Sequence, residues 1–126
     1  DTDWAIQAIG GREPAVHTLG LLADSKIYIS YMTLGELYEG AFHTSNPPAE
    51  LVILRRFTAQ FRLLGFTEPI IETFAEIRAY LRRRGLLIAD MDLLIAATAL
   101  YHNLTLLTFN RRHFDRIPDL KLYQPA

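Results

Sequence analysis

The chain has 126 residues, half of them hydrophobic, with 13 Lys and Arg against 14 Asp and Glu. This length suits one domain with one core, and the composition excludes a disordered chain. A formal net charge of −1 provides no bulk basic field for nucleic acid. A polyanion therefore has to be held at a local patch or through bound cations.

The residue types narrow the chemistry further. The absence of cysteine excludes a disulfide scaffold, a thiolate nucleophile and Cys-based metal sites. Eleven of the 13 cations are Arg, whose planar fork matches phosphate and carboxylate, and this indicates an oxyanion partner. Residues 93–110 carry no charge, but polar residues interrupt them, so we expect a buried helix and strand and no membrane span. No signal peptide is apparent.

Helical and strand-like patterns alternate from the start of the chain. Pro14 opens a predicted helix with Val16, Leu19 and Leu22 on one face, and residues 27–31 are rich in strand-forming side chains. This alternation continues to the end of the chain. It predicts an α/β fold with a mostly parallel sheet.

The middle of the chain contains two further predicted helices. The first covers residues 33–42, and the second opens at Asn46 and carries apolar residues at helical spacing, namely Leu51, Leu54, Phe57 and Phe61. Residues 62–66 fit either the last turn of that helix or a short strand, because so short an apolar run has no decisive period.

The last third of the chain begins with a helix that starts near Thr67 and stops at Gly85. Asp90 is the expected N-cap of a helix over 91–101. A turn at His102-Asn103 leads to a buried strand over 104–108. Residues 110–119 are predicted to be a polar loop before a final edge segment around Leu122 and Tyr123.

Acidic and amide side chains recur where predicted strands lead into helices or loops. The carboxyl ends of parallel strands form the usual ligand crevice of open α/β sheets. A site there that offers oxygen donors and contains no Cys or His cluster suits Mg²⁺ or Mn²⁺. These ions can activate water for the hydrolysis of a phosphodiester. The positions are Asp1 or Asp3, Glu36, Asp90 or Asp92, and Asn110.

Each of these residues also has a structural interpretation. Glu36 follows Thr33 at the spacing of a capping box, and Asp90 and Asp92 suit the start of a helix. Asp1 and Asp3 fit frayed terminal residues, and Asn110 fits a turn. The residues alone leave both interpretations open.

Two arginine clusters differ in their predicted roles. Arg82-Arg83-Arg84 suits a solvated helix end, where cations complement the helix dipole. Arg111, Arg112 and His113, beside Asn110, are better placed to contact a phosphate, although a solvated loop explains them equally well.

Taken in order, four segments resemble the motif blocks of PIN-domain ribonucleases, and most closely those of the VapC-type toxin group. The resemblance covers essentially the whole chain, and its third and fourth blocks are the most specific. The segments are DTDW at 1–4, TLGELYEGA at 33–41, ADMDLLIAATA at 89–99 and LTFNRRHF at 107–114.

The resemblance implies one PIN-like domain over residues 1–126, an α/β three-layer sandwich with a mostly parallel central sheet flanked by helices. Asp1, Glu36 and Asp92 match the metal-binding acids, and Asn110 matches the fourth catalytic position. Asp90 and Asp3 are supporting candidates, Asp90 as a further metal ligand. Arg111 and Arg112 are the predicted substrate-binding residues.

The resemblance also implies an activity and partners. It predicts an Mg²⁺- or Mn²⁺-dependent endoribonuclease that hydrolyses RNA phosphodiesters. The expected protein is a cytoplasmic toxin that works as a homodimer and is neutralised by a cognate VapB-like antitoxin.

Two departures from the family pattern affect the site. Relatives carry a short hydrophobic strand before the first Asp, so we expect such a strand to precede Asp1 in the full protein. Asn at position 110 removes one negative charge, which predicts one tightly held ion and a second, weaker one.

Two other hypotheses compete with the nuclease. One is a catalytically inactive PIN-like module that binds proteins, although the presence of all three acids argues against it. The other is an Mg²⁺-dependent phosphoryl hydrolase acting on small molecules, which activity on nucleotides rather than RNA would reveal.

Overall fold

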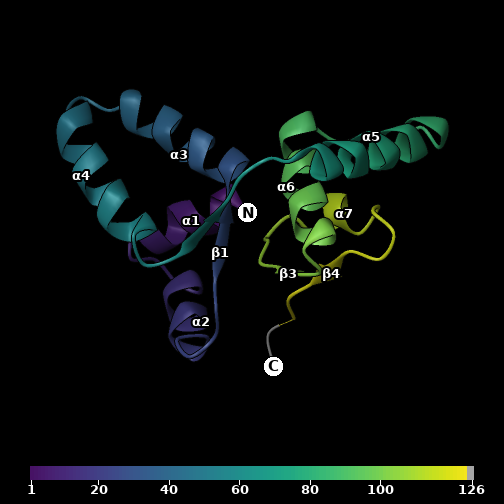
Figure 1. The fold of residues 1–126 in the computed structure, drawn as a ribbon. Helices are drawn as coiled ribbons and strands as arrows, with labels where there is room; N and C mark the ends of the chain where they lie inside the picture. The colour runs from purple at the N-terminus through teal and green to yellow at the C-terminus, as the bar shows by residue number, and fades with distance from the viewer. Residues whose placement is uncertain (125–126) are drawn as a thin grey trace. The chain divides into compact units, whose positions relative to one another are not determined.

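The computed structural model describes residues 1–124 and divides the chain into two compact units. One unit is formed by residues 2–64, and the other by Asp1 together with the chain from Gly65 onward. Figure 1 shows the helices and strands of both. Within the described residues, no helix is long and apolar enough to cross a membrane.

The unit of residues 2–64 contains four helices and two short strands. Its elements are α1 (Thr2–Ile9), α2 (Ala15–Leu21), β1 (Tyr28–Ser30), α3 (Tyr31–Phe42), α4 (Pro47–Thr58) and β2 (Arg62–Leu64). The two strands pair in parallel, with Tyr28 opposite Arg62. Residues 62–64 are therefore a strand, which decides between the two alternatives that the sequence left open.

Polar caps fix the starts of two of these helices. The Ser30 hydroxyl accepts a hydrogen bond from the Thr33 amide at 3.1 Å, and the Asn46 side chain accepts one from the Ala49 amide at 3.3 Å. Such caps satisfy backbone donors that the first turn leaves without intrahelical partners. Helix α3 consequently starts two residues earlier than predicted and continues directly from β1.

The first two helices differ from the prediction. Helix α1 was not predicted, and in α2 the buried residues are Ala15 and Thr18, whereas Val16 is 40% exposed. The Ala15 backbone amide donates to the Gln7 side chain of α1 at 3.1 Å, and α2 contacts α1. Seven residues make only two turns, too few for apolar spacing to identify the packed face.

The other unit is built on two packed helices. Its elements are α5 (Glu68–Arg83), α6 (Asp90–Tyr101), β3 (Thr105–Leu106), α7 (Arg111–Phe114) and β4 (Lys121–Leu122). Helix α5 lies against α6 (Figure 1) and buries Ile70, Ile77 and Leu81. Helix α6 is buried over most of residues 93–99, which confirms the predicted buried helix. The predicted buried strand over 104–108 is confirmed only in part, because β3 covers Thr105–Leu106 and Thr105 is exposed.

Both long helices of this unit end in a left-handed residue. Gly85 follows α5 with a φ of 65°, and the Leu86 amide donates to the Leu81 carbonyl at 2.9 Å. Asn103 follows α6 with a φ of 55°, and the Leu104 amide donates to the Ala99 carbonyl at 2.8 Å. These are Schellman motifs, and they confirm the predicted stops.

The predicted polar loop over 110–119 is wrong in part. It contains helix α7, and Phe114 and Ile117 are 1% and 3% exposed. The polar residues around them hid this packing, because a four-residue helix has no period to detect. Strand β4 then pairs in parallel with β3.

The described strands form two two-stranded parallel sheets, β1 with β2 and β3 with β4. Each pair is joined by a helical crossover, as parallel strands require. The α/β class and the parallel pairing are thus as predicted. The described strands are distributed over two small sheets, one in each unit, rather than one continuous sheet.

Candidate active site

A chain of hydrogen bonds joins Asp1 to Asn110. The Thr108 hydroxyl donates a hydrogen bond to the Asp1 carboxylate at 2.5 Å, and it accepts one from the Asn110 backbone amide at 2.9 Å. The Asp1 nitrogen donates to the Leu107 carbonyl. Two residues that are 109 positions apart in the chain are therefore connected through one threonine.

The elements around β3 explain this placement. Thr108 lies two residues beyond β3, and Asn110 is the N-cap residue of α7. The side-chain nitrogen of Asn110, Nδ2, lies 2.8 Å from Nδ1 of His113, which is one turn into α7. Asn110 is thus held through both its backbone and its side chain, which suits a residue that presents a polar group at a site.

Glu36 lies in the other unit, within a threonine-lined environment on α3. Its carboxylate accepts a hydrogen bond from the Thr2 hydroxyl at 2.5 Å, and Thr2 lies 3.3 Å from the Thr33 hydroxyl. Both threonines are buried. The capping-box interpretation of Glu36 is wrong, because Ser30 rather than Thr33 caps α3.

Two acids lie in the first turn of α6. Ala89 occupies the N-cap position, so Asp90 is the first helical residue and not the predicted N-cap. Asp90 accepts from Arg78 Nε of α5 at 2.8 Å in an ion pair. Asp92 follows two residues later and is half-buried, whereas Asp3 is exposed on α1.

The predicted phosphate contacts separate into two environments. Arg111 donates to the Tyr123 carbonyl at 3.1 Å, so its guanidinium is engaged within the fold. Arg112 is exposed at the same end of α7. Of the two, Arg112 has the freer access to solvent.

The donor set suits a hard cation by its chemistry, since Asp1, Glu36, Asp92 and Asn110 all offer oxygen atoms. Within residues 1–124, no three His, Asp or Glu side chains form a group that could hold a metal ion. Asp90 already has a cationic partner, which weighs against its role as a ligand. The metal assignments therefore stay predictions.

Thr2 and Thr108 contact the predicted site residues but were not assigned to the site from the sequence, whereas His113 was considered only as a phosphate contact. Thr108 and His113 flank Asn110 at positions −2 and +3, and this spacing is the only signal that pointed to them. Thr2 follows Asp1 directly, but its contact with Glu36 links residues 34 positions apart and had no local signal.

Comparison with known proteins decides the family. The PIN domain matches residues 1–120. This chain belongs to the PIN-domain family. Ribonuclease VapC2 of Rickettsia felis is 33% identical over 97% of this PIN domain and 92% of its own length. The tRNA(fMet)-specific endonuclease VapC of Salmonella typhimurium is 32% identical over 97% of the chain and 92% of its own length.

A solved structure extends the likeness to the fold. VapBC2 from Rickettsia felis, bound to a DNA fragment from its promoter, matches this PIN domain with a TM-score of 0.90. The match has 32% sequence identity and covers 98% of this chain and 94% of that chain. The predicted family and its α/β fold are confirmed.

Proposed function

We propose that this PIN domain is an endoribonuclease toxin of the VapC type, which hydrolyses RNA phosphodiesters and is neutralised by a VapB-like antitoxin. The observation that carries the proposal is the similarity, over 97% of the chain, to proteins named ribonuclease and tRNA(fMet)-specific endonuclease. The carboxylates and amide at positions 1, 36, 92 and 110 supply a matching chemistry.

The proposal includes dependence on Mg²⁺ or Mn²⁺, held by Asp1, Glu36 and Asp92. When bound, such an ion activates water and neutralises the charge that develops on the phosphate. Asn110 contributes a neutral amide to the same set. Asp90 is the weakest candidate, because its carboxylate already pairs with Arg78.

Residues of the chain orient these donors. The Thr108 hydroxyl donates to one oxygen of the Asp1 carboxylate, and this hydrogen bond helps to fix the side-chain rotamer of Asp1. Thr2 does the same for Glu36. Arg112, exposed beside Asn110, is the proposed contact to an RNA phosphate, while Arg111 stabilises the local fold.

The partner assignment rests on two solved relatives, VapBC2 from Rickettsia felis and VapBC from Salmonella typhimurium. Helices α3 and α4 of unit 2–64 contact each other and carry exposed apolar side chains, which suit a protein partner. They are Phe42, Val52 and Ile53, exposed by 62%, 48% and 46%. We propose this surface for the antitoxin, a homodimer as the working unit, and the cytoplasm as its location.

A substrate comparison tests the function. The protein is incubated with a cellular RNA pool and, separately, with mono- and dinucleotides, each with Mg²⁺ or Mn²⁺. The proposal predicts discrete RNA fragments and no release of phosphate from nucleotides. Phosphate release without RNA fragments would instead identify a small-molecule hydrolase.

A further inference from the structure

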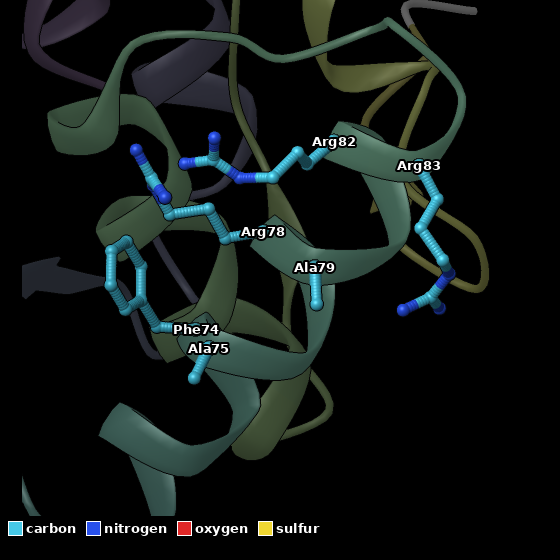
Figure 2. Close-up of a pocket in the computed structure, with 6 residues that line it drawn as sticks. All are labelled: Phe74, Ala75, Arg78, Ala79, Arg82 and Arg83. Carbon is cyan, nitrogen blue, oxygen red and sulfur yellow. The ribbon is translucent and has the colours of Figure 1, made fainter.

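An open hollow lies along helix α5, in the unit that also contains Asp1, Asp92 and Asn110. Its volume is about 460 Å³, and its lining is Phe74, Ala75, Arg78, Ala79, Arg82 and Arg83. Figure 2 shows the side chains of Phe74, Arg78 and Arg82 on one side of the helix and that of Arg83 on the other. Asp1, Asp92 and Asn110 are not among the residues that line the hollow.

The sequence of α5 creates this hollow by its spacing. Phe74, Arg78 and Arg82 are four residues apart and follow one stripe of the helix, while Ala75 and Ala79 occupy the neighbouring stripe. The two alanines project only a methyl group, so the longer side chains around them enclose space. Three of the six lining residues are cations and none is an acid.

The arginines of this region differ in their partners. Arg78 pairs with Asp90, and the Arg84 guanidinium stacks 3.6 Å from the centre of the Tyr80 ring. Within residues 1–124, the guanidinium groups of Arg82 and Arg83 have no hydrogen-bonding or ionic partner. The exposed guanidinium groups of Arg82 and Arg83 are therefore available to bind oxyanions, and their planar shape matches the oxygen atoms of a phosphate.

The ion pair of Arg78 connects the hollow to the start of α6. Asp90, its partner, is the first residue of α6, and Asp92 lies in the same turn. The basic hollow therefore adjoins the helical turn that carries one of the proposed metal ligands. Arg82 and Arg83 of α5 and Asp92 of α6 belong to the same unit.

We propose that this hollow binds the backbone of the RNA substrate at phosphates away from the cut. Arg82 and Arg83 contact the phosphates, and Phe74 offers its ring for base stacking. This inference rests on the proposed ribonuclease function. An RNA fits this hollow better than an acidic segment of the antitoxin, because the cations of Arg82 and Arg83 lie beside the aromatic ring of Phe74, which suits a polymer of phosphates and bases.

The test measures RNA binding in the full chain, independently of cleavage. A labelled single-stranded RNA is titrated in EDTA, over a range of salt concentrations, with the wild type and with the double variant Arg82→Gln, Arg83→Gln. We expect the Kd to rise about tenfold and the slope of log K against log salt to fall by about 1.4, because each lost phosphate contact accounts for about 0.7.

Two further variants control for charge and for folding. Arg55→Gln, Arg56→Gln removes the same charge from the exposed end of α4 and should leave the Kd within twofold. Arg82→Lys, Arg83→Lys keeps the charge and should restore most of the affinity. An unchanged Kd and salt slope in the Gln variant would overturn the inference, as would a loss confined to antitoxin inhibition.

Wild-type cleavage of the RNA pool separates the two proposals. If the wild type does not cleave RNA, the ribonuclease proposal fails, whatever the binding results are. If it cleaves RNA and the Gln variant binds RNA as tightly as the wild type, only the hollow is wrongly assigned.

Discussion

Thr108 is the residue on which the geometry of the candidate site most depends, because it contacts both Asp1 and Asn110. Replacement by Val keeps the shape but removes the hydroxyl. We expect RNA cleavage to fall by about 10–100-fold, the range typical of residues that orient metal ligands. Single-turnover cleavage with the Mg²⁺ concentration varied measures this.

A matched variant separates positioning from stability. Thr108→Ser retains the hydroxyl and should keep cleavage within a few fold of wild type, with an unchanged thermal midpoint. If Val and Ser variants cleave equally well, Thr108 does not position Asp1.

Asn110 determines how many ions the site holds tightly in our account. A neutral amide at the fourth position predicts one tight site and one weaker site for Mn²⁺. Asn110→Asp restores a negative charge and should tighten the second site, as measured by calorimetric titration. Two equal tight sites in the wild type would contradict this account.

For single residues, the sequence predicted the candidate site residues better than it predicted the side chains that contact them. Asp1 and Asn110 are joined by hydrogen bonds through Thr108, a tertiary contact across more than 100 residues. The N-cap prediction for Asp90 was wrong by one position, because Ala89 is the cap and the carboxylate turns to Arg78. Side-chain partners on another helix leave no local signal.

At the scale of elements, the end of α5 depends on the left-handed conformation of Gly85. An added Cβ meets no atom within 4 Å there, so any cost comes from backbone strain alone. Gly85→Ala should lower the free energy of unfolding by about 1 kcal/mol, since L-residues disfavour this region. Urea denaturation monitored by circular dichroism checks it.

Gly40 is the matched control for this prediction. It lies within helix α3, has no positive φ and has equally open space at its Cβ. Gly40→Ala should raise the free energy of unfolding by about 0.5–1 kcal/mol. Equal effects of the two substitutions would contradict the assigned role of Gly85.

Long elements were predictable and short ones were not. Helix α5 has 16 residues and helix α6 has 12. In helices of this length, the spacing of the apolar residues and the stop signals predict the same element. Helix α7 has four residues, and its buried Phe114 was hidden among charged neighbours. Helix α1 has no polar cap that the sequence reveals.

At the scale of the whole molecule, alternating helices and strands predicted the α/β class and the parallel pairing correctly. Which strands pair could not be predicted, since β1 meets β2 across 31 intervening residues and the strands are two or three residues long. Such pairing is determined by helix packing rather than by strand sequence. These patterns alone reach only a hard-metal site, and the proposed activity rests on the similarity to proteins named ribonuclease and endonuclease.

The most direct measurement of the central claim is cleavage of a cellular RNA pool by wild type and Asp92→Ala, with Mg²⁺ or Mn²⁺ and then with EDTA. Asp24→Ala, at an exposed acid between α2 and β1, is the control. We predict discrete fragments from wild type and Asp24→Ala that disappear with EDTA and in Asp92→Ala. Undiminished cleavage by folded Asp92→Ala, or no cleavage by wild type, would contradict the account.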